Sequence, residues 1–446
     1  MSHPTPSTRP DVPALLRVLG PALRALLAAP EPQAPLQVVT FDDSPVVMEY
    51  LNNAVARKAQ LAEPVNPKPS VCEVGLPLWF DLESGETPAT LIERLRGQLA
   101  AHQRQHQYNP RIILVPGLGL FAAGADAKTA QAMRQLYLDK IQKITAPGSA
   151  PLIGKAEEAR GLGVVAEPVG GRGRVRGKIA IVTGAAQGFG LEIAQSFAAE
   201  GGHVVLTDIN EAGAQAAAAE ICRRWGSGRA IGLAINVTSS VSIGACVDAV
   251  IRHYGGCDVL ISNAGVLKAE SVKTQSEKDF DFVTAVNYKG YFFCVQQVSP
   301  VLATQHQAKP NYRSDIIQIN SKSGLVGSNK NGAYAGSKFG GIGLTQSFAL
   351  ELITDGIKVN SICPGNFFDG PLWSDPNNGL FVQYLRTGKV PGAQTIADVQ
   401  KFYESKVPMG RGCTTPDVMT AVYYLIDQVY ETGQAVPVTG GQVMLA

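Results

Sequence analysis

Short apolar runs alternate with longer, helix-like segments from residue 178 to the C-terminus. Each run is the length of a strand and is apolar enough to be buried on both faces of a sheet. The runs lie at 178–183, 203–208, 229–235, 258–262, 315–320, 358–363 and 434–442. Strands that alternate with helices in this way predict an α/β fold with a doubly wound parallel sheet.

The N-terminal part of the chain has a less regular pattern. Residues 89–106 and 128–145 have helical periodicity, and residues 111–115 form a short apolar run between them. A further amphipathic helix is expected at 14–29. Residues 30–70 are dense in proline and poor in periodicity, which predicts extended connections. These features together favour a second, smaller α/β region.

The change of pattern predicts two domains. A chain of 446 residues is too long for one ordinary domain, and a hydrophobic content of 45% is enough for two packed cores. We expect an N-terminal domain at 1–172 and a C-terminal domain at 173–446. A linker rich in glycine and arginine is predicted at 161–177.

Composition narrows the classes of function. The net charge of +2 is spread over interspersed residues, so the sequence favours neither a nucleic-acid partner nor an anionic membrane, but a small-molecule substrate. The seven cysteines form no Cys-x-x-Cys pair, which argues against disulfides or a zinc cluster and fits the cytoplasm. Arg17, Pro21 and Arg24 break the apolar stretch at 14–29, so we expect no membrane span, although an organelle transit peptide is an alternative.

A glycine-rich turn follows the first strand of the larger domain. The residues after Thr183 read Gly184-Ala-Ala-Gln187-Gly188-Phe189-Gly190, and a helix begins near Leu191. Glycines at these positions allow a tight turn and let the backbone approach a pyrophosphate, which the N–H groups at the helix N-terminus stabilise. The sequence therefore predicts a dinucleotide site.

Asp208 ends the second strand, eighteen residues after Gly190. A carboxylate at this place accepts hydrogen bonds from both ribose hydroxyls and repels a 2′-phosphate. Neither Ile209 nor Asn210 offers the cation that NADP requires, so we expect NAD. The alternative is that Asp208 is only the N-cap of a helix that begins before Glu211.

Ser321, Tyr334 and Lys338 are the candidate catalytic residues. Tyr334 and Lys338 are four residues apart and share one face of a helix, where an ammonium group favours the phenolate. Ser321 follows a buried strand, at the end where open α/β sheets bind ligands. Such a pair also occurs on many helices as a solvated lysine beside a half-buried tyrosine.

The interval from Ser321 to Tyr334, the Tyr-x-x-x-Lys pair and the Thr-Gly-x-x-x-Gly-x-Gly turn resemble the short-chain dehydrogenase/reductase family. The resemblance spans about 270 residues and implies a Rossmann-type fold. It also implies that Asn287 is a fourth catalytic residue, on a helix that Ser276 caps. It also implies a set of cofactor contacts. These are Gly184, Gln187, Gly188, Phe189, Gly190, Asp208, Ile209, Asn236, Val237, Asn263, Ala264, Gly265, Tyr334, Lys338, Pro364 and Gly365.

The chain departs from the family pattern at three places. Asn236 replaces the aspartate that usually contacts adenine, and we expect its amide oxygen to accept in its place. Ser262 replaces the first asparagine of Asn-Asn-Ala-Gly. The turn after Gly365 has Asp369 where a threonine is usual, which leaves the contact to the nicotinamide carboxamide open.

Residues 316–324, 338–346 and 406–413 resemble the sorbitol-6-phosphate 2-dehydrogenase subfamily. This implies reversible oxidation of a secondary alcohol on a sugar alcohol or its phosphate, with Lys338 lowering the pKa of Tyr334 toward neutrality. The long interrupted segment at 366–410 is expected to act as a lid or clamp. Alternatives are an unphosphorylated polyol as substrate and a non-catalytic nucleotide-binding sensor. The expected substrate contacts are Ser321, Lys322, Tyr334 and Asn366, and Lys330 joins Lys322 if the substrate carries a phosphate.

Residues 110–124 resemble the junction in bacterial proteins that fuse a rhamnulose-1-phosphate aldolase to a dehydrogenase. That aldolase family binds zinc through a His-x-His pair, which this chain lacks. We expect no metal site, with His102 and His106 solvated, and a non-catalytic role in stability or assembly. The family resemblance further implies a homo-oligomer, a dimer or tetramer formed through the helices that contain Asn287 and Tyr334.

Overall fold

The computed structural model describes residues 11–53, 75–145, 173–377, 379–386 and 388–444. Most of the predicted linker at 161–177 and the proline-rich residues 54–70 lie outside the described residues. The chain forms two compact units. The first comprises Met1–Pro168 together with two later segments, Val247–Cys257 and Val301–Tyr312, and the second comprises the rest of the chain.

The second unit contains a sheet of seven parallel strands in the order β11-β10-β9-β8-β5-β6-β7. The strands are β5 (Ile179–Thr183), β6 (His203–Asp208), β7 (Ala230–Ala234), β8 (Val259–Ser262), β9 (Ser314–Ile319), β10 (Ile357–Pro364) and β11 (Ala435–Val438). The predicted doubly wound parallel sheet is confirmed. The order reverses between β5 and β8, and a ligand site is expected where the strands end at this switch point.

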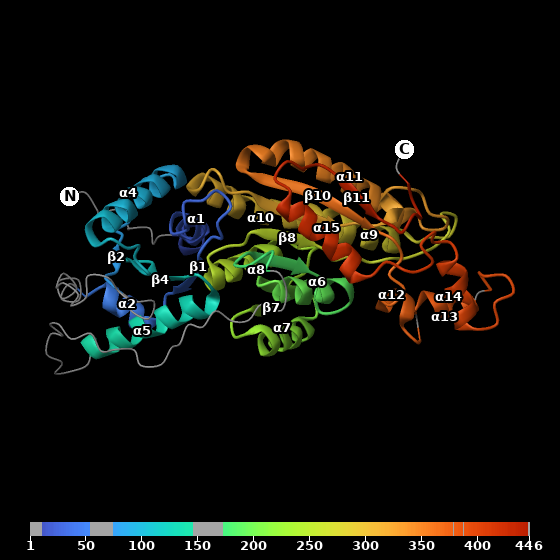
Figure 1. Ribbon diagram of the computed structural model, residues 1–446, viewed down its shortest axis with the longest axis horizontal. Helices are drawn as coiled ribbons and strands as arrows, with labels where there is room; N and C mark the ends of the chain where they lie inside the picture. The colour runs from blue at the N-terminus through green and yellow to red at the C-terminus, as the bar shows by residue number, and fades with distance from the viewer. Residues whose placement is uncertain (1–10, 54–74, 146–172, 378, 387, 445–446) are drawn as a thin grey trace, which may run out of the picture. The chain divides into compact units, whose positions relative to one another are not determined.

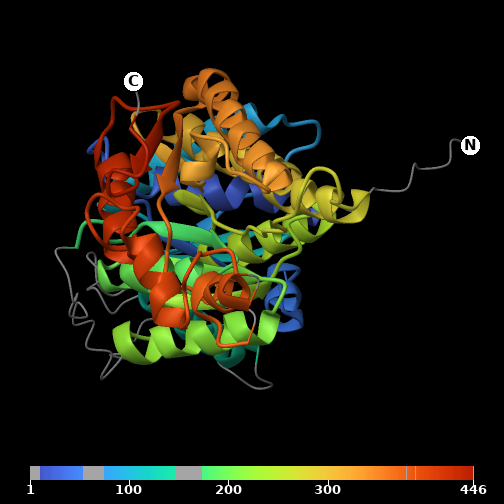
Figure 2. The same cartoon turned by 90° about the vertical axis from the view of Figure 1, so that its right-hand side faces the viewer.

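Helices cover both faces of the sheet in the second unit (Figures 1 and 2). Apolar residues of α6 (Gly188–Ala199), α7 (Glu211–Trp225) and α15 (Thr415–Asp427) pack on strand residues such as Val182 and Leu206 in one buried cluster. The other face carries α9 (Glu277–Thr284), α10 (Gly290–Ala308) and α11 (Gly332–Leu352). The helix α8 (Ser240–Tyr254) begins in the second unit and ends in the first.

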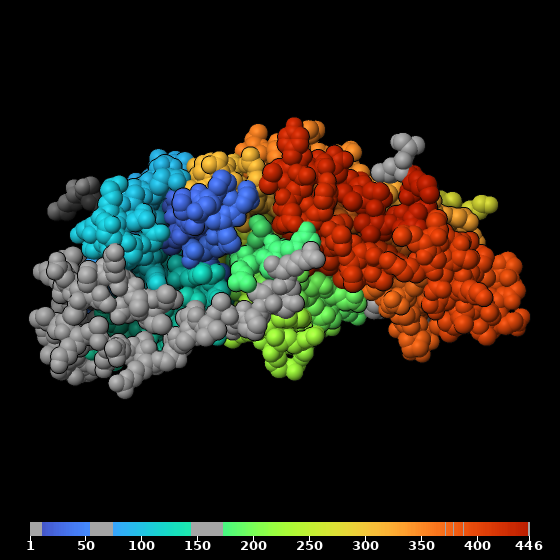
Figure 3. All heavy atoms as spheres, in the orientation of Figure 1, coloured from blue at the N-terminus to red at the C-terminus, as the bar shows by residue number. Residues whose placement is uncertain are grey.

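Residues 366–410 contain three short helices, which the sequence pattern did not predict. They are α12 (Pro371–Ser374), α13 (Leu380–Arg386) and α14 (Ile396–Glu404). We call residues 366–410 the three-helix segment. Figure 3 shows its orange-to-red atoms gathered into one lobe. The lobe has a core of its own, formed by Phe368, Trp373, Leu380, Phe381, Val390, Val399 and Val407. The segment is therefore a packed substructure rather than a long loop.

The first unit is built on a four-stranded sheet in the order β1-β4-β3-β2. Strands β1 (Val38–Asp42), β4 (Gly119–Gly124) and β3 (Ile112–Val115) are antiparallel neighbours, and β2 (Leu78–Trp79) pairs parallel with β3. Its helices are α1 (Val12–Leu26), α2 (Pro45–Leu51), α4 (Pro88–His106) and α5 (Ala127–Thr145). The expectation that residues 30–70 form only extended connections is wrong, because β1 and α2 lie there.

A buried arginine links distant segments within the first unit. Arg24 is 0% exposed. Its Nε donates to the Gln37 carbonyl at 2.9 Å and its Nη1 to Gln305 Oε1 at 2.6 Å. Gln305 Nε2 in turn donates to the Cys257 carbonyl at 2.7 Å. A buried guanidinium group is tolerated only when it is paired in this way, so segments 247–257 and 301–312 complete the core of this unit.

His102 differs from the prediction that it is solvated. Its side chain is buried, and its ring nitrogens lie 3.3 Å from the Tyr108 carbonyl and 3.2 Å from the Leu76 carbonyl. Among the described residues, no three His, Cys, Asp or Glu side chains are placed to hold one metal ion. Across the same ranges, no helix has both the length and the apolar character needed to cross a membrane.

Candidate functional site

The glycine turn between β5 and α6 has the geometry that its sequence predicts. Gly184 and Gly188 adopt φ values of 66° and 59°, a region in which a side chain is strained. A Cβ at position 190 would lie 2.2 Å from the Gly184 carbonyl oxygen. Only glycine therefore allows α6 to begin this close to the end of β5. The first N–H groups of α6 lack helical partners and are suited to an anion.

Asp208 is held beside this turn. Its Oδ2 accepts a hydrogen bond from the Ala186 N–H at 3.0 Å, and its Oδ1 accepts one from the Asn210 N–H at 2.9 Å. The N-cap of α7 is Asn210, whose side chain accepts from the Gly213 N–H at 3.1 Å. The alternative role of Asp208 as the N-cap is therefore wrong. The carboxylate is fixed at the place where a ribose is expected.

Asn263, which is expected to contact the cofactor, also has contacts within the protein. Its Nδ2 donates to the carbonyls of Thr183 and Gly184 at 2.9 and 3.1 Å, and its own N–H donates to Thr183 Oγ1 at 3.0 Å. Its side chain thus ties the end of β8 to the glycine turn. Gly265 lies close to the candidate catalytic residues, because a Cβ there would be 3.5 Å from Asn287 Oδ1 and 3.8 Å from Lys338 Nζ.

The amide oxygen of Asn236, which was expected to accept from adenine, already accepts two hydrogen bonds. Both come from Thr238, from its N–H at 3.0 Å and its hydroxyl at 2.8 Å. Val237 is largely buried, and it lies 3.0 Å from the position that a Cβ on Gly290 would take. The amide NH₂ of Asn236 is consequently the group better suited to a base.

Tyr334 and Lys338 lie one turn apart on α11. Lys338 Nζ is 5.6 Å from the centre of the Tyr334 ring, and it donates a hydrogen bond to the Ile319 carbonyl at 3.1 Å. Ser321 lies two residues after the end of β9, and its side chain is hydrogen-bonded to that of Tyr334. The three candidate residues therefore converge at the carboxyl end of β9, as the sequence predicts.

Four residues that sequence reasoning missed fix the packing of the β9 end against α11. Asn320 Nδ2 donates to the Lys338 carbonyl at 2.9 Å, and Asn320 Oδ1 accepts from the Ser321 N–H at 2.8 Å. A Cβ at Gly324 would lie 2.4 Å from that Oδ1, and one at Gly341 would lie 2.5 Å from Gln318 Nε2. Gly324 in η2 (Lys322–Gly324) and Gly341 within α11 are the sequence signal that points to this close packing.

Asn287 lies in a π-helical turn, η1 (Ala285–Lys289), between α9 and α10. Such turns are rare and often occur at functional sites. Its Oδ1 accepts from the Val266 N–H at 2.8 Å, and its Nδ2 donates to the Val266 carbonyl and to Ser337 Oγ. Ser337 Oγ donates to the Tyr334 carbonyl at 2.7 Å. The turn thus connects Asn287 to the first turn of α11.

Burial controls protonation at this site. It raises the pKa of Tyr334, and the hydrogen bond with Ser321 lowers that pKa by a smaller amount. Burial also lowers the pKa of Lys338 to about 8. The expectation that Lys338 brings the pKa of Tyr334 toward neutrality is therefore not met in this structure. Tyr334 is a protonated phenol at neutral pH, which is the form that donates a proton.

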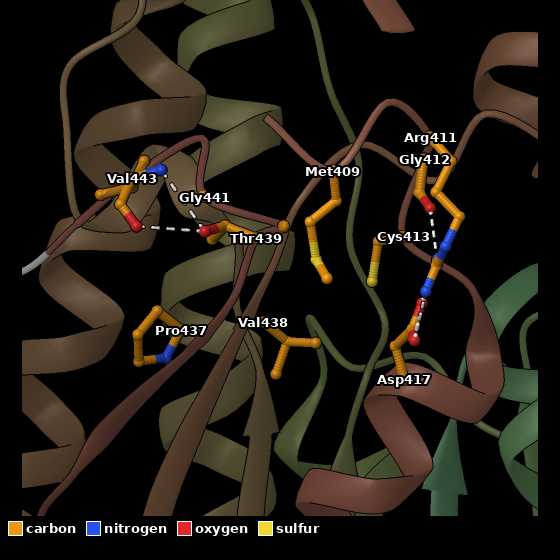
Figure 4. A pocket seen from close by; sticks show the side chains of 11 residues that line it. Met409, Arg411, Gly412, Cys413, Asp417, Pro437, Val438, Thr439, Gly441 and Val443 are labelled. Atoms are coloured by element: carbon orange, nitrogen blue, oxygen red, sulfur yellow. Dashed lines mark hydrogen bonds and ion pairs between the residues drawn. The ribbon is translucent and has the colours of Figure 1, made fainter. Parts of the chain in front are cut away.

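The turn after β10 is held from two sides. The Gly365 N–H donates to the Val438 carbonyl at 2.9 Å, and the Cys413 N–H donates to the Asn366 carbonyl at 2.8 Å. The adjoining hollow has a volume of about 380 Å³ and the Arg411–Asp417 ion pair in its wall. Figure 4 shows the side chains that line it. Lining residues from 409–413 and 437–443 thus fix the backbone of this turn.

The glycine turn and the turn after β10 also meet through two aromatic rings. Phe189 stacks on Phe367, with ring centres 3.9 Å apart and an interplanar angle of 15°. Sequence reasoning assigned Phe189 to the cofactor and did not consider Phe367. The contact puts the expected pyrophosphate and nicotinamide ends of the site on neighbouring walls.

Residues 178–374 match the model of the short chain dehydrogenase family. The sorbitol-6-phosphate 2-dehydrogenase of Escherichia coli (strain K12) is 37% identical over 269 residues, which is 60% of this chain and 99% of that protein. The chain belongs to the short-chain dehydrogenase family. It is therefore an oxidoreductase of a family that uses NAD or NADP.

Other relatives also carry the names of sugar-alcohol dehydrogenases. The galactitol 2-dehydrogenase of Agrobacterium fabrum is 34% identical over 273 residues, 61% of this chain and 99% of that protein. The crystal structure of sorbitol-6-phosphate 2-dehydrogenase from Erwinia amylovora superposes with a TM-score of 0.55 at 39% identity, and the match covers 60% of this chain and all of that one. These matches leave the N-terminal region unassigned.

Proposed function

We propose that the protein interconverts a secondary alcohol and a ketone on a sugar alcohol or its phosphate, with NAD as cofactor. The observation that carries this proposal is the convergence of Ser321, Tyr334 and Lys338 beside the glycine turn. A nicotinamide cofactor bound there supplies the hydride acceptor or donor. The chain itself supplies the proton and holds the reacting oxygen.

The protein groups divide this work. In reduction the Tyr334 phenol gives its proton to the ketone oxygen and becomes a phenolate. In oxidation that phenolate takes the proton of the alcohol and becomes the phenol again. Ser321 shares a hydrogen bond with Tyr334 and holds the same oxygen. Lys338 is buried next to both groups, and when protonated it stabilises the phenolate that remains after proton transfer.

The residues of the glycine turn fit a dinucleotide, and Asp208 favours NAD over NADP. Two backbone N–H groups fix its carboxylate, which is ready to accept from two ribose hydroxyls and repels a phosphate. Ile209 is 79% exposed and carries no charge. We expect kcat/KM with NADH to exceed that with NADPH at least tenfold, because the loss of one charged hydrogen bond lowers affinity by about this factor. Equal values would reject this assignment.

The names of the relatives support the substrate class. The proteins from Escherichia coli and Agrobacterium fabrum are named for oxidation at position 2 of a six-carbon chain, one phosphorylated and one not. We infer that this chain acts on the secondary alcohol at that position. An unphosphorylated polyol is the second candidate, supported by the galactitol enzyme.

The experiment is a screen of NADH oxidation against ketoses and ketose phosphates. We expect turnover with at least one of them and a loss of at least about a hundredfold in Tyr334→Phe, the scale of a missing general acid, with NADH binding retained. Tyr424→Phe changes an exposed tyrosine of α15 and is the matched control. NADH binding without turnover on any ketose would instead indicate a nucleotide sensor.

We also propose that the N-terminal region is non-catalytic and that the protein works in the cytoplasm as a dimer or tetramer. The role in stability is supported by Arg24 and Gln305, which join N-terminal residues to segments 247–257 and 301–312 in one core. Zinc-dependent cleavage of a ketose 1-phosphate by the purified protein would contradict the first part. Sedimentation of the full chain decides the oligomeric state.

A further inference from the structure

Four lysines from separate segments form a group that includes Lys322, the residue that follows Ser321. Lys322 opens the short 3-10 helix η2 (Lys322–Gly324), and Lys330 precedes α11. Lys389 lies between α13 and α14, and Lys406 follows α14. We call these four residues the lysine cluster. Two of its members thus come from the strand–helix connection that carries Ser321, and two come from the three-helix segment.

Aromatic rings hold the two lysines of the three-helix segment. Lys389 Nζ lies 3.9 Å from the centre of the Tyr384 ring, and Lys406 Nζ lies 4.1 Å from that of Phe402 and 5.7 Å from that of Tyr403. The rings of Tyr384 and Tyr403 are neighbours, with centres 5.4 Å apart. Cation–π contacts of this kind keep both ammonium groups near one surface.

The charges of the cluster act on one another. Burial lowers the pKa of Lys322, and the charge of Lys406 lowers it further. Burial likewise lowers the pKa of Lys389, followed by the charges of Lys330 and Lys406. These effects link Lys322 to Lys406, and Lys389 to Lys330 and Lys406, although the two segments are more than fifty residues apart in sequence.

The cluster has no carboxylate partner among the residues that the structure describes. Glu270 lies within electrostatic reach of Lys330. Its pKa is lowered first by hydrogen bonds with Thr274 and the Ser271 N–H, and least by Lys330. Four like charges brought together without neutralisation repel each other, and this cost is recovered when a dianion binds.

We propose that the lysine cluster binds the phosphate group of a phosphorylated polyol or ketose whose reacting carbon lies at Ser321 and Tyr334. Lysine ammonium groups on flexible stems suit a phosphate, whose oxygens accept charge-assisted hydrogen bonds from several directions. Lys322 directly follows Ser321 and so connects the two ends of the substrate. The substrate phosphate would then bridge the Ser321 connection and the three-helix segment. The part of this inference that places the reacting carbon at Ser321 and Tyr334 rests on the proposed function.

The test compares fructose 6-phosphate with fructose in NADH oxidation. We expect the wild-type protein to prefer fructose 6-phosphate to fructose. Lys389→Ala and Lys406→Ala should each lower kcat/KM for fructose 6-phosphate by about tenfold, which is the scale of one charged hydrogen bond. The value for fructose should change less than about threefold, since neither lysine touches the reacting carbon. Lys389→Arg should retain most of the activity. Lys401→Ala on α14 is the matched control, because the charge of Lys401 acts on Asp398 instead.

Calorimetric titration with fructose 6-phosphate and with fructose, in the presence of NAD, separates this inference from the proposed function. If no ketose is reduced, the proposed function fails, and weaker binding of fructose 6-phosphate by the double variant K389A/K406A still supports a phosphate site. Equal binding by wild-type and double-variant protein overturns the inference. A wild-type preference for fructose, or an equal loss for both sugars in the variants, overturns it as well.

Discussion

The glycine-turn side of the second unit and the three-helix segment are held together in different ways. The turn at 184–190, Asp208 and Asn263 are fixed by backbone hydrogen bonds and by contacts too close for any side chain at position 190. The three-helix segment is fixed by its own aromatic and aliphatic core, including Trp373 and Phe381. One side depends on backbone geometry and the other on packing.

This difference fits the roles that we propose for the two sides. A pyrophosphate is bound by backbone N–H groups, so the protein must come close to it without a side chain in between. A sugar chain is distinguished by side chains, and a small core can position them while the sheet remains unchanged. We therefore expect damage on the two sides to separate cofactor binding from substrate binding.

Of the two changes that test this comparison, Gly190→Ala has the larger expected effect. The added Cβ would lie 2.2 Å from the Gly184 carbonyl oxygen and 2.6 Å from Asn263 Nδ2, and backbone cannot yield as a flexible side chain does. We expect NADH to bind at least about thirtyfold more weakly, since overpacking of this kind costs on the order of 2 kcal/mol or more. Fluorescence titration with NADH measures the loss.

Gly97→Ala is the control for this change. Gly97 lies within α4, and a Cβ there meets no atom within 4 Å. The same substitution should leave NADH binding unchanged and stabilise its helix by roughly 0.5–1 kcal/mol, through the helix propensity of alanine. NADH binding by Gly190→Ala that equals the wild-type value would contradict the backbone-limited account of the turn.

The sequence predicted the features that rest on local rules. The seven strands, the turn at 184–190 and the pairing of Tyr334 with Lys338 follow from apolar runs, glycines and helical spacing, which are readable within a few residues. The protonation of Tyr334 did not follow, because desolvation depends on everything packed around the phenol. The bond from the Asn263 side chain to the Thr183 carbonyl did not follow either, because it depends on the pairing of β8 with its neighbour β5.

Short and discontinuous features were missed. Helices α12 to α14 have fewer than ten residues each, too few for a periodic pattern to appear. Strand β1 lies in a proline-rich stretch and owes its place to its antiparallel neighbour β4. The approach of Lys406 to Lys322 and of Lys389 to Lys330 is set by tertiary packing. The sequence therefore identified Lys322 and Lys330 as phosphate candidates but not their partners.

The second prediction concerns Trp373→Ala in the three-helix segment. The Trp373 ring is 8% exposed, and its centre lies 5.0 Å from that of Phe368, 5.1 Å from those of Phe381 and Tyr403, and 5.9 Å from that of Tyr384. Its removal leaves a cavity that costs about 3–5 kcal/mol. This loss should loosen the two tyrosines that hold Lys389 and Lys406.

We expect this variant to lower kcat/KM for fructose 6-phosphate several-fold. Its dissociation constant for NADH should stay within about twofold of the wild-type value, because none of the hydrogen bonds around Asp208 and Asn263 involves the three-helix segment. Tyr430→Ala removes an aromatic ring that is 96% exposed and should change neither quantity. Parallel losses of cofactor and substrate binding in Trp373→Ala would mean that the two sides form one cooperative structure. A loss confined to the sugar phosphate would instead show that the core of the segment exists to position its lysines.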